Sequence, residues 1–420
     1  MFKFIISFFI FLHFILFAAG QDRVQQFVKQ TAVPIPTIEP DSTNFSDLEA
    51  IGTAIGDATI VMLGEQDHGD APVFLAKTRL IKYLHEKKGF NVLAFESDFF
   101  GLNEGWEHLT KEKPAMDSFF RKNIFPIWTY CNTCSNLFFD YLPGTYKTAH
   151  PVMVTGFDNQ MILGYSSRNL VSKLDSVLRQ LDLPVVKEPG YSTVIIPAID
   201  SLRHYYSKLL NNPDFYGCGK YLAKIKQQAA EKNLGENDFW MQVIDNLIAE
   251  NTEYQLLKTD KQQSGNTRDL QMAQNLQWLA TVKYPTEKII VWAANAHIAK
   301  YADSLKDDPG KAITAMGSFF TRNNVLLKKT YILGFTSYEG EAGRLGFKNF
   351  TIRKPKSDGF ESWIDKSWNY AFVDFRNFTE RSEPFYLKGL GHNSFFKKDW
   401  AKIFDGIFYI KEMYPCKSMK

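Results

Sequence analysis

Short apolar runs that alternate with helical segments are the feature that most constrains the fold of this sequence. A helix can begin near Pro72 and end at Gly89, because proline suits a first helical turn and glycine suits the residue after the last turn. This helix lies between two apolar runs and gives a strand, a helix and a strand in succession. We therefore predict an α/β fold with a mostly parallel central sheet flanked by helices. The four runs of the predicted sheet cover residues 59–63, 91–95, 151–157 and 288–293.

The chain between residues 166 and 284 has a mainly helical pattern. Its segments include LVSKLDSVLRQLDL and FWMQVIDNLIAENTEYQLL, in which apolar residues recur every three or four positions. Strand-like runs resume at residues 330–336 and 371–375. We therefore predict that residues 166–284 form a helical lobe inserted into the sheet domain.

Residues 1–20, MFKFIISFFIFLHFILFAAG, combine one early lysine, a long apolar run and small residues before Gln21. This pattern predicts a signal peptide cleaved close to Gln21, so we expect the mature protein to be secreted or periplasmic. An uncleaved N-terminal anchor is the alternative, since the apolar run is long for a signal peptide. No later stretch has the roughly 20 apolar residues of a membrane-spanning helix, so we expect no stable membrane insertion after cleavage.

The distribution of charge argues against a nucleic-acid partner. The sequence holds 49 Lys and Arg against 46 Asp and Glu, a formal net charge of +3, and the basic residues are scattered along it. A phosphate-binding surface needs a basic patch or stripe, which this pattern does not supply. A hydrophobic content of 45% is enough for a sizeable core, so we expect a folded chain.

The four cysteines are Cys131, Cys134, Cys218 and Cys416. Export permits disulfides, but the pairing cannot be read from the spacing. Cys131 and Cys134 form a C-x-x-C motif without a second such motif and without a preceding thioredoxin-like strand. We therefore favour a plain disulfide or free thiols over a redox or metal role.

Polar side chains follow each of the four predicted strands at the point where the strand ends. Because the carboxyl ends of parallel strands meet at one edge of a sheet, we expect these side chains to share a cleft. Each one taken alone has a structural explanation as a helix cap, a solvated group or a buried imidazole. Carboxylates and imidazoles that share a cleft can divide acid and base roles, which favours a functional site. The residues are Glu65 and His68, then Glu96, then Asp158, then Asn295 and His297.

These residue types suit hydrolysis by activated water. A histidine takes a proton near neutral pH, and a neighbouring carboxylate fixes its tautomer, so His68 with Glu65 or Glu96 can act as a general base. His297 can donate a hydrogen bond to a developing oxyanion or to the leaving oxygen. The sequence has no G-x-S-x-G elbow, no H-E-x-x-H motif and no Walker loop.

Four segments, in order, carry a resemblance to a known family. They read GEQDHG, TRLIKYLHEKKGFNVLAFESD, RDLQMAQNLQWL and VWAANAH. In these segments the chain resembles the erythromycin esterase family, across roughly residues 45–340. The resemblance implies one hydrolase domain over residues 21–420 that attacks an ester carbonyl with water, as the antibiotic-resistance members do with the ring ester of a macrolide.

The resemblance also implies roles for individual residues. His68 matches the general base, Glu65 and Glu96 its carboxylate partners, and His297 the second imidazole. Two arginines match as well, and helical periodicity favours Arg268, because Arg79 falls opposite the apolar stripe of its helix. As candidate substrate-binding residues we name Asp158, Asn295, Asn275 and Trp128.

Two departures from the family pattern concern the substrate. Asp67 stands where the family usually has Thr, and Ala294 stands where it has the first His of the last motif. We therefore expect a small-molecule ester that need not be a macrolide, and no cofactor or metal. One alternative is a metal-dependent hydrolase with the same Glu and His residues as ligands. The other is a non-catalytic exported binding protein, with Trp106, Trp128 and Trp292 as candidate walls.

Overall fold

The computed structural model describes residues 23–204, 213–301, 314–379 and 383–419. The predicted signal peptide at residues 1–20 lies outside them. Within the described residues, no helix is long and apolar enough to cross a membrane.

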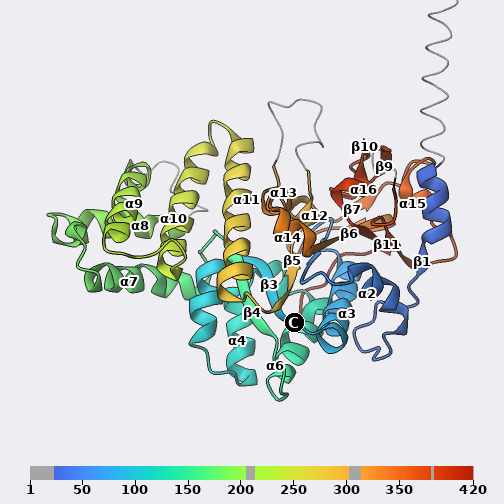
Figure 1. Cartoon of the computed structure of the whole chain (residues 1–420), viewed down its shortest axis with the longest axis horizontal. Helices are drawn as coiled ribbons and strands as arrows, with labels where there is room; N and C mark the ends of the chain where they lie inside the picture. The colour runs from blue at the N-terminus through green and yellow to red at the C-terminus, as the bar shows by residue number, and fades with distance from the viewer. Residues whose placement is uncertain (1–22, 205–212, 302–313, 380–382, 420) are drawn as a thin grey trace, which may run out of the picture.

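A nine-stranded sheet forms the centre of the molecule (Figure 1). Its strand order is β1-β8-β11-β6-β2-β5-β3-β4, and β7 pairs with β6. The six strands from β11 to β4 are parallel, whereas β1, β7 and β8 pair antiparallel with their neighbours. The mostly parallel sheet predicted from the sequence is confirmed. The strands are β1 (Val33–Pro34), β2 (Ile60–Leu63), β3 (Phe90–Asp98), β4 (Met153–Asp158), β5 (Lys288–Trp292), β6 (Thr330–Ala342), β7 (Phe350–Ile352), β8 (Tyr370–Asp374) and β11 (Gly406–Met413).

The central strands are apolar on both faces because each face is covered. In β2, Ile60 and Met62 belong to one buried cluster, whereas Val61 and Leu63 belong to another on the opposite face. Side chains of a strand alternate between its two faces, so an unbroken apolar run is the expected pattern for a strand buried on both sides.

The helix α3 (Ala71–Lys88) connects β2 to β3 as predicted. Pro72 lies in its first turn, and Gly89 follows its last turn with φ = 72°, a left-handed conformation that glycine adopts without strain. β2, α3 and β3 therefore form the βαβ unit that the sequence predicted.

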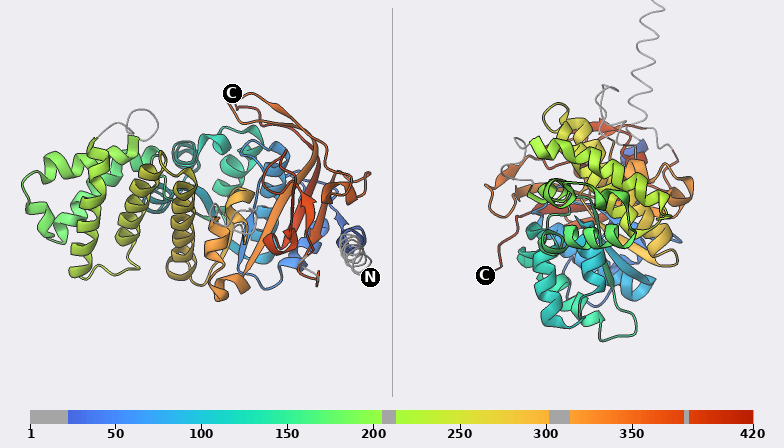
Figure 2. Two further views of the ribbon diagram at one scale, coloured as in Figure 1. Left: turned by 90° about the horizontal axis from the view of Figure 1, so that it is seen from above. Right: turned by 90° about the vertical axis from the view of Figure 1, so that its left-hand side faces the viewer.

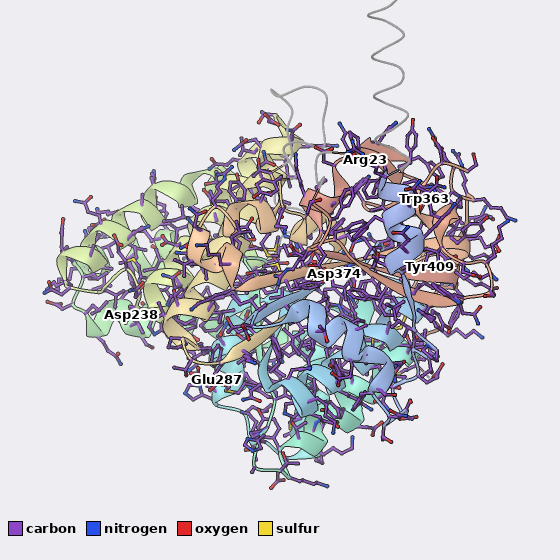
Figure 3. The ribbon with its side chains drawn as sticks, turned by 45° about the vertical axis from the view of Figure 1, so that its right-hand side comes forward. Arg23, Asp238, Glu287, Trp363, Asp374 and Tyr409 are labelled. Carbon is purple, nitrogen blue, oxygen red and sulfur yellow. A yellow bond between two sulfur atoms is a disulfide. The ribbon has the colours of Figure 1, made fainter. Side chains whose placement is uncertain are left out.

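Between β4 and β5 the described chain is helical and forms a lobe beside the sheet. Figures 1 and 2 show α7 to α10 extending away from the sheet, while α11 lies alongside it. Figure 3 places Asp238, just before α10, on the side of the molecule opposite Trp363 and Tyr409 of the C-terminal third. The helices of the lobe are α7 (Gly164–Gln180), α8 (Ile196–Ser201), α9 (Pro213–Glu231), α10 (Phe239–Leu256) and α11 (Lys261–Trp278).

The remaining elements cover the sheet or extend its C-terminal side. A two-stranded sheet of β9 (Phe385–Leu387) and β10 (Phe396–Lys398) precedes the last long strand. The other helices are α2 (Glu49–Ile55), α4 (Lys113–Asn123), α5 (Pro126–Thr129), α6 (Leu142–Thr145), α12 (Asn295–Ile298), α13 (Met316–Phe320), α14 (Asn324–Lys328), α15 (Phe360–Trp363) and α16 (Trp400–Ile403).

One disulfide joins Cys131 to Cys416, with 5.4 Å between the Cα atoms. Cys134 and Cys218 are buried free thiols. The C-x-x-C motif thus contributes one cysteine to a long-range crosslink, which ties the loop after α5 to the C-terminal segment.

Candidate active site

The segment between β2 and α3, residues 64–70, is tightly enclosed, and because it carries the candidate catalytic residues Glu65 and His68, we call it the catalytic loop. At Gly64 an added Cβ would lie 1.8 Å from the side-chain oxygen of Asn295. At Gly69 it would lie 1.9 Å from the carbonyl oxygen of Gly343. Neither site admits a larger residue without a shift of its neighbours, so the two glycines let the loop pass close to the side chain of Asn295 and the backbone of Gly343.

Glu65 is a buried carboxylate that accepts hydrogen bonds from three side chains. Its Oε1 atom lies 2.7 Å from Nδ1 of His68 and 3.0 Å from Nε1 of Trp128. Its Oε2 atom lies 2.6 Å from Nζ of Lys77. With Nδ1 of His68 donating to the carboxylate, the neutral imidazole presents Nε2 as its proton acceptor.

Lys77 supports Glu65 from the apolar side of α3. Its ammonium group is fully buried, donates to the carbonyl of Ala293 at 3.2 Å and lies 4.3 Å from the centroid of the Trp292 ring. Burial lowers the pKa of Lys77, and the charge of Glu65 opposes this shift. Sequence reasoning missed Lys77, although a lysine on the apolar stripe with Val73 and Phe74 was an available signal.

His297, on α12, is held between two carboxylates. Nδ1 lies 2.7 Å from Oδ1 of Asp269, and Nε2 lies 3.2 Å from Oε1 of Glu96. Burial alone would lower the pKa of His297, but the charges of Asp269 and Glu96 raise it to about 10. Both ring nitrogens can therefore donate, and the ring is an imidazolium at neutral pH.

Glu96 lies where the pairing of β3 becomes irregular. The register with β4 shifts between Phe95 and Asp98, and such a bulge re-aims a side chain. Oε1 faces His297, and Oε2 accepts the backbone N–H of Ala294 at 3.0 Å. Burial raises the pKa of Glu96, but His297, followed by His68 and Arg268, lowers it well below its usual range.

Arg268, on α11, joins the ends of two strands. It pairs with Asp158 through two hydrogen bonds, Nε to Oδ1 at 3.1 Å and Nη2 to Oδ2 at 2.6 Å. Nη2 also lies 3.2 Å from Oε1 of Glu96, and Nη1 lies 3.4 Å from Nε2 of His297. The next residue, Asp269, was missed in the sequence even though it belongs to the RDLQMAQ segment.

Strand order explains why these side chains meet. The strands β2, β5, β3 and β4 are neighbours in the sheet. β2 leads into the catalytic loop and β5 leads towards α12, while Glu96 lies near the end of β3 and Asp158 is the last residue of β4. Solvent reaches the histidines and the arginine, because the side chains of His68, His297 and Arg268 are 16%, 17% and 18% exposed. The side chains of Glu65 and Asp158 are fully buried. This cluster of side chains thus presents nitrogen groups to solvent, with carboxylates behind them.

In the structure, four other candidate residues make supporting contacts within the protein. Trp128 is buried and holds Glu65, so it does not form a wall open to ligand. Asp158 is buried behind Arg268. Asn295 donates to the carbonyls of residues 335 and 389 and accepts from the backbone N–H of residue 335. Asn275 donates to the carbonyl of residue 157 and exchanges hydrogen bonds with the amide of residue 246. The hydrogen-bonding groups of these side chains are engaged within the protein.

Arg79 is not brought into this group. Its guanidinium makes two hydrogen bonds of 2.7 Å to Asp47 and also donates to the carbonyls of Thr37 and Asn44. These contacts hold the N-terminal segment against α3. The face of α3 opposite its apolar stripe is therefore also buried, beneath the N-terminal segment.

Trp106 and Trp292, the other candidate walls, are core residues. Trp106 packs against Phe119 and Phe120, and Trp292 packs against Phe74 and Phe95. Among the described residues, no group of three or more His, Cys, Asp or Glu side chains is arranged to hold a metal ion. The carboxylates of the cluster are instead paired with cationic or N–H groups.

Comparison with known proteins supports the fold and the family. The erythromycin esterase family model matches residues 85–413, more than half of the chain. The chain is 28% identical over 389 residues to YbfO of Bacillus subtilis (strain 168), provisionally named a hydrolase, covering 85% of this chain and 83% of YbfO. It is 24% identical over 429 residues to erythromycin esterase type II of Escherichia coli, covering 93% and 98% of the two chains.

Solved structures show the same fold. A Bacillus cereus protein superposes with a TM-score of 0.70 at 18% identity, covering 95% of this chain and 99% of that one. The erythromycin esterase EreC, in an open conformation of a His-to-Asn mutant, superposes with a TM-score of 0.66 at 16% identity, covering 92% and 99%. The matched family region begins after Glu65 and His68, and in the structure strand order connects these two residues to the rest of the site.

Proposed function

The chain belongs to the erythromycin esterase family, and from this premise we propose that it hydrolyses a carboxylic ester with a water molecule activated by His68. Family membership supports a hydrolase. The choice of bond and of base is our inference from the chemistry of the clustered side chains.

The observation that carries this proposal is the difference between the two histidines. His68 has one carboxylate partner at Nδ1, and its Nε2 atom has no hydrogen-bond partner among the residues of the described ranges. His297 has carboxylate partners at both nitrogens and carries a proton at neutral pH. An imidazole with one unengaged ring nitrogen, in the same site as an imidazolium, gives one candidate proton acceptor and one cation.

In the proposed reaction, Nε2 of His68 takes a proton from water as the water oxygen bonds to the ester carbonyl carbon. The carbonyl oxygen becomes an oxyanion, which the positive charges of Arg268 and His297 stabilise. When the carbon–oxygen ester bond breaks, the leaving alkoxide takes the proton back from His68. The products are a carboxylic acid and an alcohol, and Glu65 stabilises the transient imidazolium of His68 throughout.

We propose a substrate class that is broader than macrolides. The name of the Escherichia coli relative makes a macrolide ring ester one candidate. Asp67 and Ala294 replace residues of the family motifs beside His68 and Glu96, and Ala294 retains only its backbone N–H as a donor there. A ring ester gains the mass of one water on hydrolysis, whereas an open ester splits into two products.

Incubation of the protein with a panel of chromogenic esters and macrolides, followed by mass spectrometry, tests the proposal. We expect turnover of at least one ester by the wild type and its loss in His68→Asn. The matched control is His85→Asn, because His85 lies on α3 and its hydrogen bonds go to Tyr141 and the carbonyl of His150, which are not residues of the candidate site. Equal turnover by His68→Asn and the wild type would refute the role of His68.

A further inference from the structure

A second hydrogen-bonded series of side chains lies next to the catalytic loop. Oγ of Ser337, on β6, is 2.8 Å from Nδ1 of His392, and Nε2 of His392 is 2.8 Å from Oδ1 of Asp70. Ser337 and Asp70 are fully buried, and His392 is 3% exposed. The series connects the core of the sheet to the last residue of the catalytic loop.

Serine, histidine and aspartate in this order resemble a nucleophilic triad, but their burial argues against that role. A nucleophile must reach a substrate carbonyl, and Ser337 has no exposed surface. Both nitrogens of the His392 ring are also engaged within the protein. The series is better suited to holding structure than to attacking a substrate.

What it holds is the backbone at His68. The second oxygen of Asp70, Oδ2, accepts the N–H of Asp67 at 2.9 Å. Oδ1 of Asp67 in turn accepts the N–H of His68 at 2.8 Å. The ring of His392 is therefore connected through two aspartates to the backbone of the proposed general base.

A second side chain also reaches this loop, but it is more exposed. Arg344 pairs with Asp67, and its side chain is 45% exposed, so solvent screens this ion pair. The side chains of Asp70 and His392 are 0% and 1% exposed. Loss of His392 would leave a buried carboxylate without its partner, which costs more than the loss of a surface pair.

Two further contacts bring the segment around His392 to the site. Nε2 of Gln66 donates to the carbonyl of Lys388 at 2.6 Å, and Nδ2 of Asn295 donates to the carbonyl of Gly389 at 2.7 Å. Residues 388–392 therefore contact both the catalytic loop and the helix that carries His297.

We propose that His392 is a positioning residue for His68, acting through Asp70 and Asp67. By holding Asp70, His392 fixes the backbone from which His68 meets the attacking water. The inference rests on the proposed function for its kinetic consequence, but its structural consequence can be measured without a substrate.

The kinetic test compares His392→Asn with the wild type on an ester that the wild type hydrolyses. A small misplacement of a catalytic group costs up to about 100-fold in rate, so we expect kcat to fall by roughly 10- to 100-fold with little change in KM. His392→Gln should recover part of kcat, because its amide N–H can still reach Asp70. In a His68→Asn background, the same change at His392 should cause no further loss.

The substrate-free test is hydrogen exchange measured by mass spectrometry. We expect the backbone amides of Asp67 and His68 to exchange faster in His392→Asn than in the wild type, and to be unchanged in His85→Asn. Ser337→Ala is the milder variant if His392→Asn fails to fold, and it should raise exchange at the same two amides. Faster exchange without turnover of any ester would support the positioning of the loop and count against the proposed function alone.

Two results would overturn the inference. One is unchanged exchange in folded His392→Asn and Ser337→Ala. The other is the same fold-decrease in kcat when His392→Asn is introduced into the wild type and into His68→Asn. That result would indicate a general loss of structure, which does not depend on His68.

Discussion

The Nδ1 atom of His297 lies 2.7 Å from Oδ1 of Asp269, while Glu96 occupies the other side of the same ring at 3.2 Å. Two carboxylates against one imidazole stabilise its protonated form. His68 has a single carboxylate partner, Glu65. The same residue type thus has different surroundings on two adjacent strand ends, and this difference is the basis of the proposed division of roles.

The surroundings of His297 predict a pH-dependent contribution to stability. Its folded pKa of about 10 is above the ordinary value of 6.5, so the proton is held more tightly in the folded state. The stabilising contribution is complete below pH 6.5 and is lost as the pH rises towards 10. We expect the free energy of unfolding in urea to fall over this window more steeply for the wild type than for His297→Asn. Parallel curves for the two proteins would show that His297 is not protonated as described.

Asp269 should control the protonation of His297 during turnover. Its removal leaves only Glu96 beside the ring, so Asp269→Asn should lower the pKa of His297. In the proposed mechanism His297 acts in its protonated form, so its deprotonation should set the alkaline limb of the plot of kcat/KM against pH. We expect this limb to move to lower pH in Asp269→Asn and the acidic limb to stay at the same pH. The control is Asp260→Asn, which lies at the start of the same helix and caps it. An alkaline limb that does not move in Asp269→Asn would assign that limb to another group.

The fold and much of the candidate site could be predicted because both depend on local pattern. Apolar runs located the strands, and the residues following them, from Glu65 to His297, meet because parallel strands share an edge. The supporting residues could not be found in this way. Asp70 and His392 are 322 positions apart, and no motif marks their contact. Whether an amide such as Asn295 faces a ligand or a backbone carbonyl likewise depends on packing that the sequence pattern does not describe.

Arg79 should affect stability rather than activity. Its side chain is 2% exposed and pairs with Asp47, and breaking a buried pair typically costs about 3–5 kcal/mol. Arg79→Met should therefore lower the free energy of unfolding by roughly that amount, with kcat of the folded fraction unchanged. Lys82→Met, on the same helix, is the control, because Lys82 is partly exposed and donates to one carbonyl. A fall in kcat without loss of stability would return Arg79 to the active site.

Chelation tests the metal-dependent alternative directly. Glu65 already accepts from three donors, and Glu96 faces His297, Arg268 and a backbone N–H, so both carboxylates are engaged without an ion. We expect ester hydrolysis to survive prolonged treatment with EDTA. Loss of activity that one particular divalent metal restores would instead make these residues ligands and place a metal-bound hydroxide at the centre of the mechanism.

The pair of His68 and Glu65 gives the most direct test of the proposed mechanism. General-base catalysis contributes roughly 10² to 10⁴-fold, so His68→Asn should lower kcat by at least that order while the protein keeps its fold. Glu65→Gln should also be damaging, because it replaces the carboxylate that orients Nδ1 of His68 and neutralises the charge beside Lys77. Residues that serve one proton transfer are strongly non-additive, so the double variant should lose little more than His68→Asn alone. Kinetics of the two single variants and the double variant, with thermal unfolding as the control for folding, measure this coupling. Fully additive losses would mean that Glu65 serves a task separate from His68, and full activity in His68→Asn would remove water activation by this residue.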